Sequence, residues 1–155
     1  MDLKSLIAAR LNDHLDELRS FVDGLTEEQL SDRRSNGHRS LSDIVHHLAD
    51  VQDAYIDIVA HILLQDLPTV VPPPLENGVF PSEPNLSARL DEFTRHRRNL
   101  VSLLAALSDH HWRREGHHPV IPHYTLEKCL EEMMRHEESH FFEMYHIFFG
   151  IDDLQ

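Results

Sequence analysis

The chain has 155 residues, the size of one ordinary domain, and we expect a single domain over residues 1–155. Its 14 Lys and Arg against 27 Asp and Glu give a formal charge of −13, which argues against a nucleic-acid partner because phosphate binding needs a basic surface. The low glycine count, 5, argues against an all-β design, whereas 14 histidines are unusual for this length.

Neither a secretory leader nor a membrane span is expected. Charges interrupt residues 1–18 every few positions, and no segment reaches the roughly 18 consecutive apolar residues of a membrane helix. Cys129 is the single cysteine, so an intramolecular disulfide and a zinc site built of thiolates are both excluded. These features predict a cytoplasmic protein without a membrane partner.

The first predicted helix spans residues 3–22. One apolar stripe runs along it at three- and four-residue steps: Leu3, Ile7, Leu11, Leu18 and Val22. His14 falls on the same stripe, and Gly24 is the kind of residue that follows a helix end. A short helical turn at 26–30 and a polar loop with the turn signal Asn36-Gly37 are predicted next.

The second predicted helix begins after Ser40, because Ser40 and Asp43 form a variant of the capping box. Its apolar stripe consists of Ile44, Leu48, Val51, Tyr55, Ile58 and Ile62. The helix is expected to stop before Pro68. Six of the eight prolines lie in residues 68–84, where their fixed φ and missing N–H donors exclude regular helix and central strand. We predict a long crossover loop here.

The third predicted helix spans residues 86–107, with Asn85 as its cap. Residues 108–123 are interpreted as a loop. The fourth predicted helix covers about 126–149 and has Thr125 as its cap. Four amphipathic helices, no strand pattern and a long Pro-rich crossover between the second and third helices predict an all-α four-helix bundle.

Helical geometry separates the histidines of the second helix. Because successive residues rotate by about 100°, His47 lies roughly 60° from the centre of the apolar stripe and His46 roughly 160° from it. His46 is therefore expected on the solvent face together with Asp50, Asp53 and Asp57, whereas His47 is expected at the edge of the core. For a lone histidine at such an edge, a hydrogen-bonded boundary residue is the usual interpretation.

The fourth helix carries the string His136-Glu137-Glu138-Ser139-His140. Two histidines at i and i+4 lie on one helical face, which lets two imidazoles bind one metal ion. Apolar neighbours direct both rings towards the bundle interior: Met133, Phe141, Met144 and Phe148. With His47 as a third inward histidine, the set has the composition of a catalytic metal site with open positions. A polar helix face without metal is the alternative.

The same string fits the H-E-x-x-H motif, in which Glu137 would be the general base of a metalloprotease. One protease subclass has its third ligand at the position of His146. That subclass needs a glycine where this chain has Glu143, and on an unbroken helix His146 points more than about 100° away from His136 and His140. We therefore do not favour a protease. Glu137 is then a partner of a ligand, a base acting on water, or a buried paired carboxylate.

Two more charged residues are candidates for the site. Glu143 shares the face of the histidine pair, where it would bind a ligand imidazole, contact a substrate in a catalytic role, or be an ordinary carboxylate at the bundle edge. Arg97 interrupts the apolar stripe of the third helix. It is either a bidentate ligand of a substrate carboxylate or an ion-pair partner of Glu137 in the core, and we favour the ion pair.

Several short motifs follow one another in a recognisable order: Ser40-Leu41-Ser42-Asp43-Ile44, His47-Leu48-Ala49-Asp50, the segment from Arg114 to Pro119, Thr125-Leu126, His136 and His140. Together they resemble the DinB-like, or damage-inducible, family of four-helix bundles, over nearly the whole chain. The sequence departs from the family pattern at Gly37-His38-Arg39, where a tryptophan is frequent, and at Glu143, where glutamine is frequent.

The resemblance implies a function. In that family the three motif histidines bind a divalent metal, commonly zinc or nickel, and they correspond here to His47, His136 and His140. Members include S-transferases that use bacillithiol or mycothiol, and members are often homodimers. The chain is therefore expected to be a metal-dependent transferase in which a small thiol, or water, attacks an electrophilic small-molecule substrate. A non-catalytic metal-binding stress-response protein is the main alternative, and a metal-dependent hydrolase is a minor one.

Overall fold

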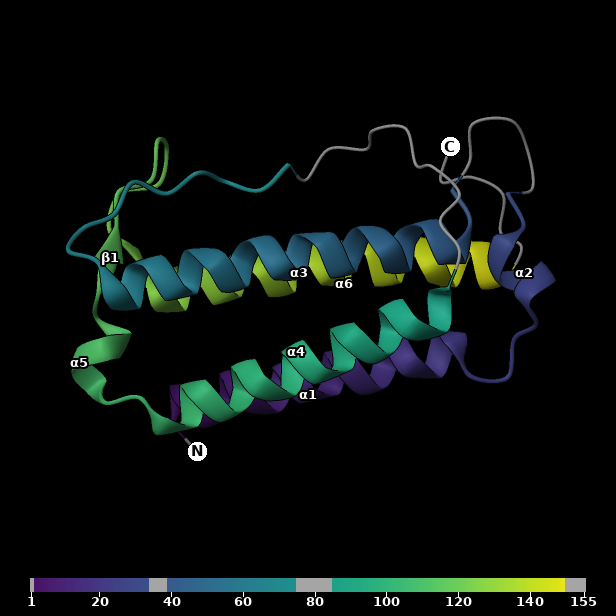
Figure 1. Ribbon diagram of the computed structural model, residues 1–155, viewed down its shortest axis with the longest axis horizontal. Coiled ribbons are helices and arrows are strands. Elements are labelled where there is room, and N and C mark those ends of the chain that lie inside the picture. The colour runs from purple at the N-terminus through teal and green to yellow at the C-terminus, as the bar shows by residue number, and fades with distance from the viewer. Residues whose placement is uncertain (1, 34–38, 75–84, 150–155) are drawn as a thin grey trace.

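The computed structural model describes residues 2–33, 39–74 and 85–149, and four long helices form a bundle within them (Figure 1). These helices are α1 (Leu3–Val22), α3 (Leu41–Leu64), α4 (Leu86–Ala106) and α6 (Leu126–Phe149). The shorter elements are α2 (Glu27–Ser31), α5 (Asp109–Trp112), β1 (Glu115–Gly116) and β2 (Tyr124–Thr125). The predicted all-α four-helix bundle is confirmed. The expected turn at Asn36-Gly37 lies outside the described residues.

The order of the helices around the bundle explains the long crossover. Both α4 and α6 pack against α1 and α3, so the neighbours run α1, α4, α3, α6 around the bundle. Figure 1 shows that α3 and α4 run in the same direction. The chain must therefore return over the length of α3, about 36 Å for its 24 residues, before α4 begins. The predicted Pro-rich crossover falls between these two helices, and its residues 75–84 lie outside the described residues.

Side-chain caps set the starts of three long helices, and that of α1 is Asp2, whose Oδ1 accepts the N–H of Ser5 at 2.8 Å. Ser40 Oγ accepts the backbone N–H of Asp43 at 3.0 Å and Asp43 Oδ2 accepts that of Ser40 at 2.9 Å, which confirms the capping box of α3. Thr125 Oγ1 accepts the N–H of Lys128 at 3.3 Å. The prediction for Asn85 was wrong. A side-chain cap needs an extended backbone, whereas Asn85 has φ 66° and makes no side-chain cap bond.

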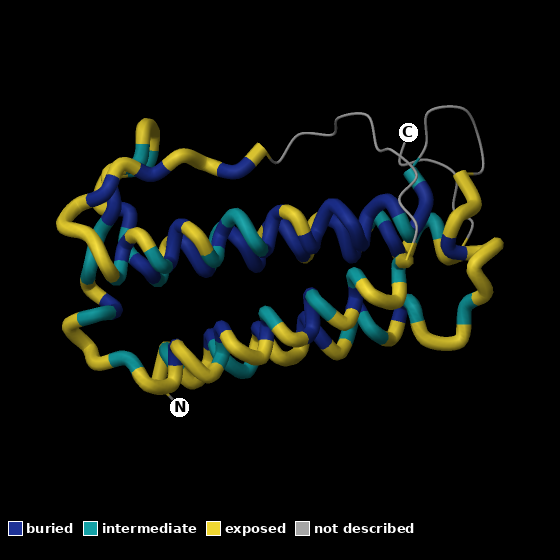
Figure 2. The backbone as a smooth tube through the Cα atoms, in the orientation of Figure 1, coloured by how far each residue is buried: buried dark blue, intermediate teal, exposed yellow. Residues whose placement is uncertain are grey.

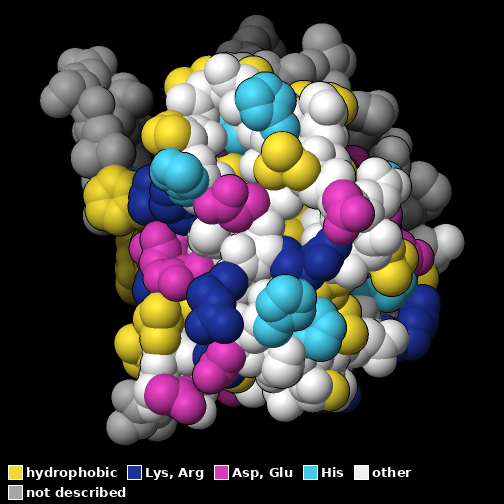
Figure 3. Space-filling model, turned by 90° about the vertical axis from the view of Figure 1, so that its left-hand side faces the viewer, with side chains coloured by type: hydrophobic (Ala, Val, Ile, Leu, Met, Phe, Trp, Pro, Cys, Tyr) yellow, Lys and Arg dark blue, Asp and Glu magenta, His cyan; other side chains and the backbone are white. Residues whose placement is uncertain are grey.

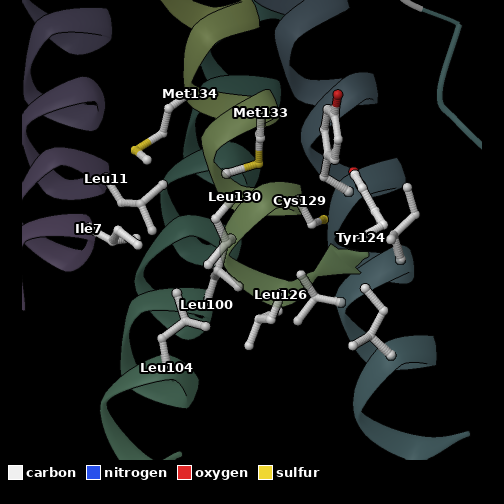
Figure 4. Close-up of a cluster of buried hydrophobic side chains, with 14 of the residues drawn as sticks. Ile7, Leu11, Leu100, Leu104, Tyr124, Leu126, Cys129, Leu130, Met133 and Met134 are labelled. Carbon is white, nitrogen blue, oxygen red and sulfur yellow. The ribbon is translucent and has the colours of Figure 1, made fainter. Parts of the chain in front are cut away.

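Two apolar clusters fill the interior. The first, seen in Figure 4, lies where α4 ends and α6 begins, and it includes Ile7, Leu11, Leu100, Leu104, Leu126, Cys129 and Leu130. The second lies near the start of α3 and the end of α6, and it includes Phe21, Ile44, Leu48, Phe93 and Phe141. Among the described residues, no helix combines the length and apolarity that crossing a bilayer requires.

The first half of α3 is buried on nearly all sides (Figure 2). Residues 43–49 are all buried, and this run includes His46, which is 8% exposed. The prediction that His46 faces solvent was therefore wrong. Its angle from the apolar stripe takes no account of elements outside the four long helices, such as α2, which packs against α3.

The segment 108–123, predicted as a loop, contains α5 and β1. β1 pairs antiparallel with β2, so a small two-stranded sheet joins α5 to the start of α6. Two-residue strands are too short to produce an alternating pattern, which is why the sequence did not reveal them. Histidine side chains gather on this end of the molecule (Figure 3), and His110, His117 and His123 are exposed.

The same segment closes the end of α3. Arg114 donates from Nε to the carbonyl oxygen of Ile62 at 2.7 Å and from Nη2 to that of Gln65 at 2.6 Å. Carbonyl groups at a helix C-terminus otherwise lack a protein partner, so Arg114 acts as a cap. Gly116 packs so closely that a Cβ atom there would lie 2.5 Å from Cγ2 of Val70. The Arg-x-Gly part of the family-like segment thus has a structural role.

Candidate metal centre

Three histidines meet where α3 packs against α6. His47 lies in the second turn of α3, whose start is set by Ser40 and Asp43. His136 and His140 lie one turn apart on α6, so their side chains leave the same face of that helix. The imidazole centroids are 5.2 Å (His47 to His136), 4.9 Å (His47 to His140) and 4.5 Å (His136 to His140) apart.

The Nε2 atoms of the three rings converge. Nε2 of His136 lies 3.2 Å from Nε2 of His47 and 3.0 Å from Nε2 of His140. Two imidazole nitrogens bound to one ion at about 2.1 Å lie about 3.0 to 3.4 Å apart for ligand angles between about 90° and 109°. The three side chains therefore form a group that fits a divalent cation.

Burial keeps two of these rings in the form that binds metal. Together with the neighbouring His140, it lowers the pKa of His47 and of His136 to about 4. Both imidazoles are therefore neutral at pH 7, and a neutral imidazole offers one nitrogen lone pair to a metal ion. A cation at the centre would accept lone pairs from rings that otherwise face one another.

Glu143 sets the orientation of the third ring. Its Oε1 lies 3.0 Å from Nδ1 of His140 and 3.0 Å from Nη2 of Arg39. Burial raises the pKa of Glu143, but the hydrogen bond from His140 and the charge of Arg39 outweigh it and lower the pKa overall. An ionised carboxylate only accepts, so His140 carries its proton on Nδ1 and keeps the lone pair on Nε2.

Glu137 belongs to a different group of side chains, although it follows His136 in the sequence. Its carboxylate is 2% exposed, accepts Nδ1–H of His14 at 2.9 Å and forms an ion pair with Nη2 of Arg97. Nε of Arg97 donates to Oε1 of Gln52 at 2.7 Å. We call His14, Gln52, Arg97 and Glu137 the four-helix polar cluster, because α1, α3, α4 and α6 each contribute one residue.

Comparison with known proteins identifies the family. The family model described as the DinB superfamily matches residues 10–144. The chain belongs to the DinB superfamily. A similar solved structure is that of YfiT from Bacillus subtilis, which is described as a probable metal-dependent hydrolase with an unusual four-helix bundle topology. The TM-score is 0.77 at 22% sequence identity, over 95% of this chain and 87% of YfiT, so the likeness shows the shared fold. No curated protein matches the chain.

In this DinB-superfamily protein, Glu143 contacts His140, one of the three predicted ligands. Arg97 and Glu137 instead contact each other, away from the histidine group. Arg97 is 0% exposed and contacts only core groups, so the structure favours the ion pair over the substrate ligand, because a fully buried guanidinium cannot reach a substrate. Nδ1 of His146 lies 2.7 Å from the carbonyl oxygen of Phe142, outside the histidine group. Sequence reasoning named Arg39 only as part of a departure from the family pattern and gave it no role, whereas the structure pairs it with Glu143.

The DinB-superfamily fold brings a second group of potential ligands together, between α3 and α4. It consists of Asp53, Glu92 and His96, and Nδ1 of His96 lies 2.8 Å from Oδ1 of Asp53. Arg89 already forms ion pairs with Glu92 and, at 3.5 Å, with Asp53. A guanidinium therefore supplies the positive charge at this position, which distinguishes the group from the histidine centre.

Proposed function

We propose that this DinB-superfamily protein is a metal-dependent enzyme that activates a small thiol for attack on an electrophilic small molecule. The convergence of Nε2 atoms from His47, His136 and His140 carries the proposal. Imidazole ligands suit zinc and nickel, the metals that we propose. When bound, such a cation supplies a Lewis acid that lowers the pKa of a thiol or of water towards neutrality.

The residues of the chain would divide the work as follows. His47 from α3 and the histidine pair from α6 hold the ion, and three protein ligands leave positions for a substrate, as in catalytic zinc sites. His47 and His136 are each 9% exposed and His140 is 5% exposed, so the three rings are buried but not completely sealed from solvent. Glu143 holds the proton of His140 on Nδ1 and is in turn held by Arg39. We assign Glu143 to positioning rather than to proton transfer.

Hydrolysis is the second candidate, and the likeness to YfiT favours it because that protein is described as a probable metal-dependent hydrolase. The same three histidines would then serve a water nucleophile. A third outcome is a metal-binding stress-response protein without turnover. A cytoplasmic location and a homodimer also stay proposals, and analytical ultracentrifugation of the purified protein tests the dimer.

The metal content of protein purified without a histidine tag tests the centre. We expect wild type to retain about one divalent ion per chain, as three imidazoles and an open position suffice for tight binding. His47→Ala and His136→Ala should lose it. His146→Ala is the matched control, because His146 lies on α6 outside the group and should leave metal content unchanged. Equal metal content in all four proteins would refute the proposed ligands.

Turnover by the metal-loaded protein separates the candidate reactions. Transfer predicts that wild type consumes monochlorobimane only when a small thiol is present, and that His47→Ala does not accelerate this reaction. Hydrolysis predicts release of para-nitrophenol from its acetate ester without any thiol. A protein that retains its metal and accelerates neither reaction would support the non-catalytic alternative.

A further inference from the structure

A surface cavity between α1 and α4 is lined by arginine side chains. Its volume is about 520 Å³, and its lining consists of Arg19, Asp91, Thr94, Arg95, Arg98 and Asn99. We call it the arginine-lined cavity. None of its residues belongs to the histidine centre, which lies between α3 and α6. A volume of this size falls within the range of small-molecule sites.

The charge of the arginine-lined cavity opposes that of the chain. Three guanidinium groups and one carboxylate give the lining a formal charge of +2, whereas the chain carries −13. Six arginines elsewhere in the described chain have carboxylate partners, namely Arg10, Arg33, Arg39, Arg89, Arg97 and Arg114, whereas the exposed Arg113 and Arg135 form no ion pair with a described residue. Arg95 and Arg98 form no ion pair with a described residue, in spite of the 27 acidic residues in the sequence.

The cavity also contains an arginine held in place. Nη1 of Arg19 donates to Oγ1 of Thr94 at 2.8 Å, and this hydroxyl donates to the carbonyl oxygen of Leu90 at 2.8 Å. Thr94 is only 6% exposed, so it is a fixed anchor. Asp91 lies 3.8 Å from the same nitrogen of Arg19, a long ion pair that leaves the guanidinium free to bind a second anion.

The two unpaired arginines complete the arrangement. Arg95 and Arg98 are three residues apart on α4, and side chains at this spacing are neighbours on a helix. Like charges at this spacing repel each other, and a bound anion relieves the repulsion. Guanidinium groups bind carboxylate and phosphate in a bidentate manner, so the cavity offers several donors to one anionic group.

We propose that the arginine-lined cavity binds a small molecule that carries a dianionic group, either a phosphate monoester or a dicarboxylate. Arg19, Arg95 and Arg98 would contact the anion, and the amide of Asn99 would contact a neutral polar part of the molecule. This site is separate from the proposed reaction centre, so either of them can exist without the other.

Isothermal titration calorimetry of the metal-free full chain tests the site, with ribose 5-phosphate and succinate as probes at about 100 mM NaCl, where long-range charge effects are screened. Metal-free protein prevents the probes from binding at the histidine centre.

We expect one of the probes to bind with one site per chain. Arg95→Gln/Arg98→Gln should weaken its binding by about tenfold or more, because charged hydrogen bonds are lost. Arg113→Gln is the matched control, since Arg113 is exposed and lies outside the cavity.

Preference for one probe identifies the anion as phosphate or as dicarboxylate. Absence of binding by both probes would overturn the proposal, and so would equal binding by wild type and the double variant. Because Arg95 and Arg98 are exposed, the double variant should keep the thermal midpoint of wild type, which calorimetry checks. It should also keep its metal content, so a failure at this site is distinguishable from a failure of the proposed metal centre.

Discussion

Oε1 of Glu143 lies 3.0 Å from Nδ1 of His140, while Nε2 of the same ring lies 3.0 Å from Nε2 of His136. The two nitrogens of His140 are thus divided between a carboxylate and the histidine group. A carboxylate on the outer nitrogen fixes the tautomer and the ring plane and makes the inner nitrogen a better ligand. In the sequence, His140 and Glu143 are three residues apart on α6, which places the two side chains next to each other on one helical face.

Removal of this carboxylate should weaken metal binding. We expect Glu143→Ala to raise the Kd for zinc by about 10- to 100-fold, as for other carboxylates that orient a ligand histidine. Glu143→Gln should lose less, because its amide oxygen still accepts the proton of Nδ1. Competition with a chromophoric chelator measures both constants. Glu127→Ala, in the first turn of α6, is the control, and the same Kd for it and Glu143→Ala would contradict the role.

The sequence was sufficient to predict that the three histidines face one another, because helical periodicity determines side-chain direction. Their binding of a metal ion stays a prediction. The i, i+4 spacing puts His136 and His140 on one face, and the apolar stripe puts His47 at the edge of the core. The same method failed for His46, since a helical wheel does not contain the segments that cover a helix from outside. It could not find Arg39, because residues in loops have no periodicity.

The fold was predictable for a similar reason. Four amphipathic helices and a long proline-rich connection between the second and third of them predict a four-helix bundle with one long crossover. The small features were not predictable. The pairing of β1 with β2 and the close approach of Gly116 to Val70 depend on tertiary contacts between residues far apart in the chain. The sequence also left two roles open for Arg97, because its guanidinium group can bind either a substrate carboxylate or the carboxylate of Glu137.

Metal removal should destabilise the fold. The three Nε2 atoms converge only in the folded chain, so an ion at about 1,000 times its Kd adds about 4 kcal/mol to the free energy of unfolding. Urea titrations of wild type with zinc and with a chelator measure this difference. His47→Ala should show little difference between the two conditions. An unchanged midpoint for chelated wild type would indicate that the histidines do not bind the ion in the native state.

Arg97 should matter for stability rather than for substrate affinity. Arg97→Met leaves the carboxylate of Glu137 buried without its cation, and removal of one partner of a buried pair costs about 3–5 kcal/mol. Arg97→Met/Glu137→Leu removes both charges and should recover much of this loss. Urea unfolding of both variants measures it. Wild-type stability for Arg97→Met, combined with a raised KM, would instead support the substrate-binding interpretation.

Any side chain at position 116 should destabilise the fold while Val70 is present. A Cβ at position 116 would lie 2.5 Å from Cγ2 of Val70, and this valine is 5% exposed and stiff at χ1, so it cannot move away cheaply. Cγ1 of Ile62 and the carbonyl oxygen of Pro68, both at 3.4 Å, limit movement of the glycine itself. We expect Gly116→Ala to lower the free energy of unfolding by about 1–3 kcal/mol, the usual cost of overpacking.

A double-mutant cycle isolates this contact from the other effects of each substitution. Val70→Ala creates space opposite position 116, so Gly116→Ala should cost clearly less in the Val70→Ala background than in wild type. Urea unfolding of the four proteins gives the coupling energy. Equal costs in both backgrounds would show that backbone strain, and not the methyl group of Val70, requires glycine at this position.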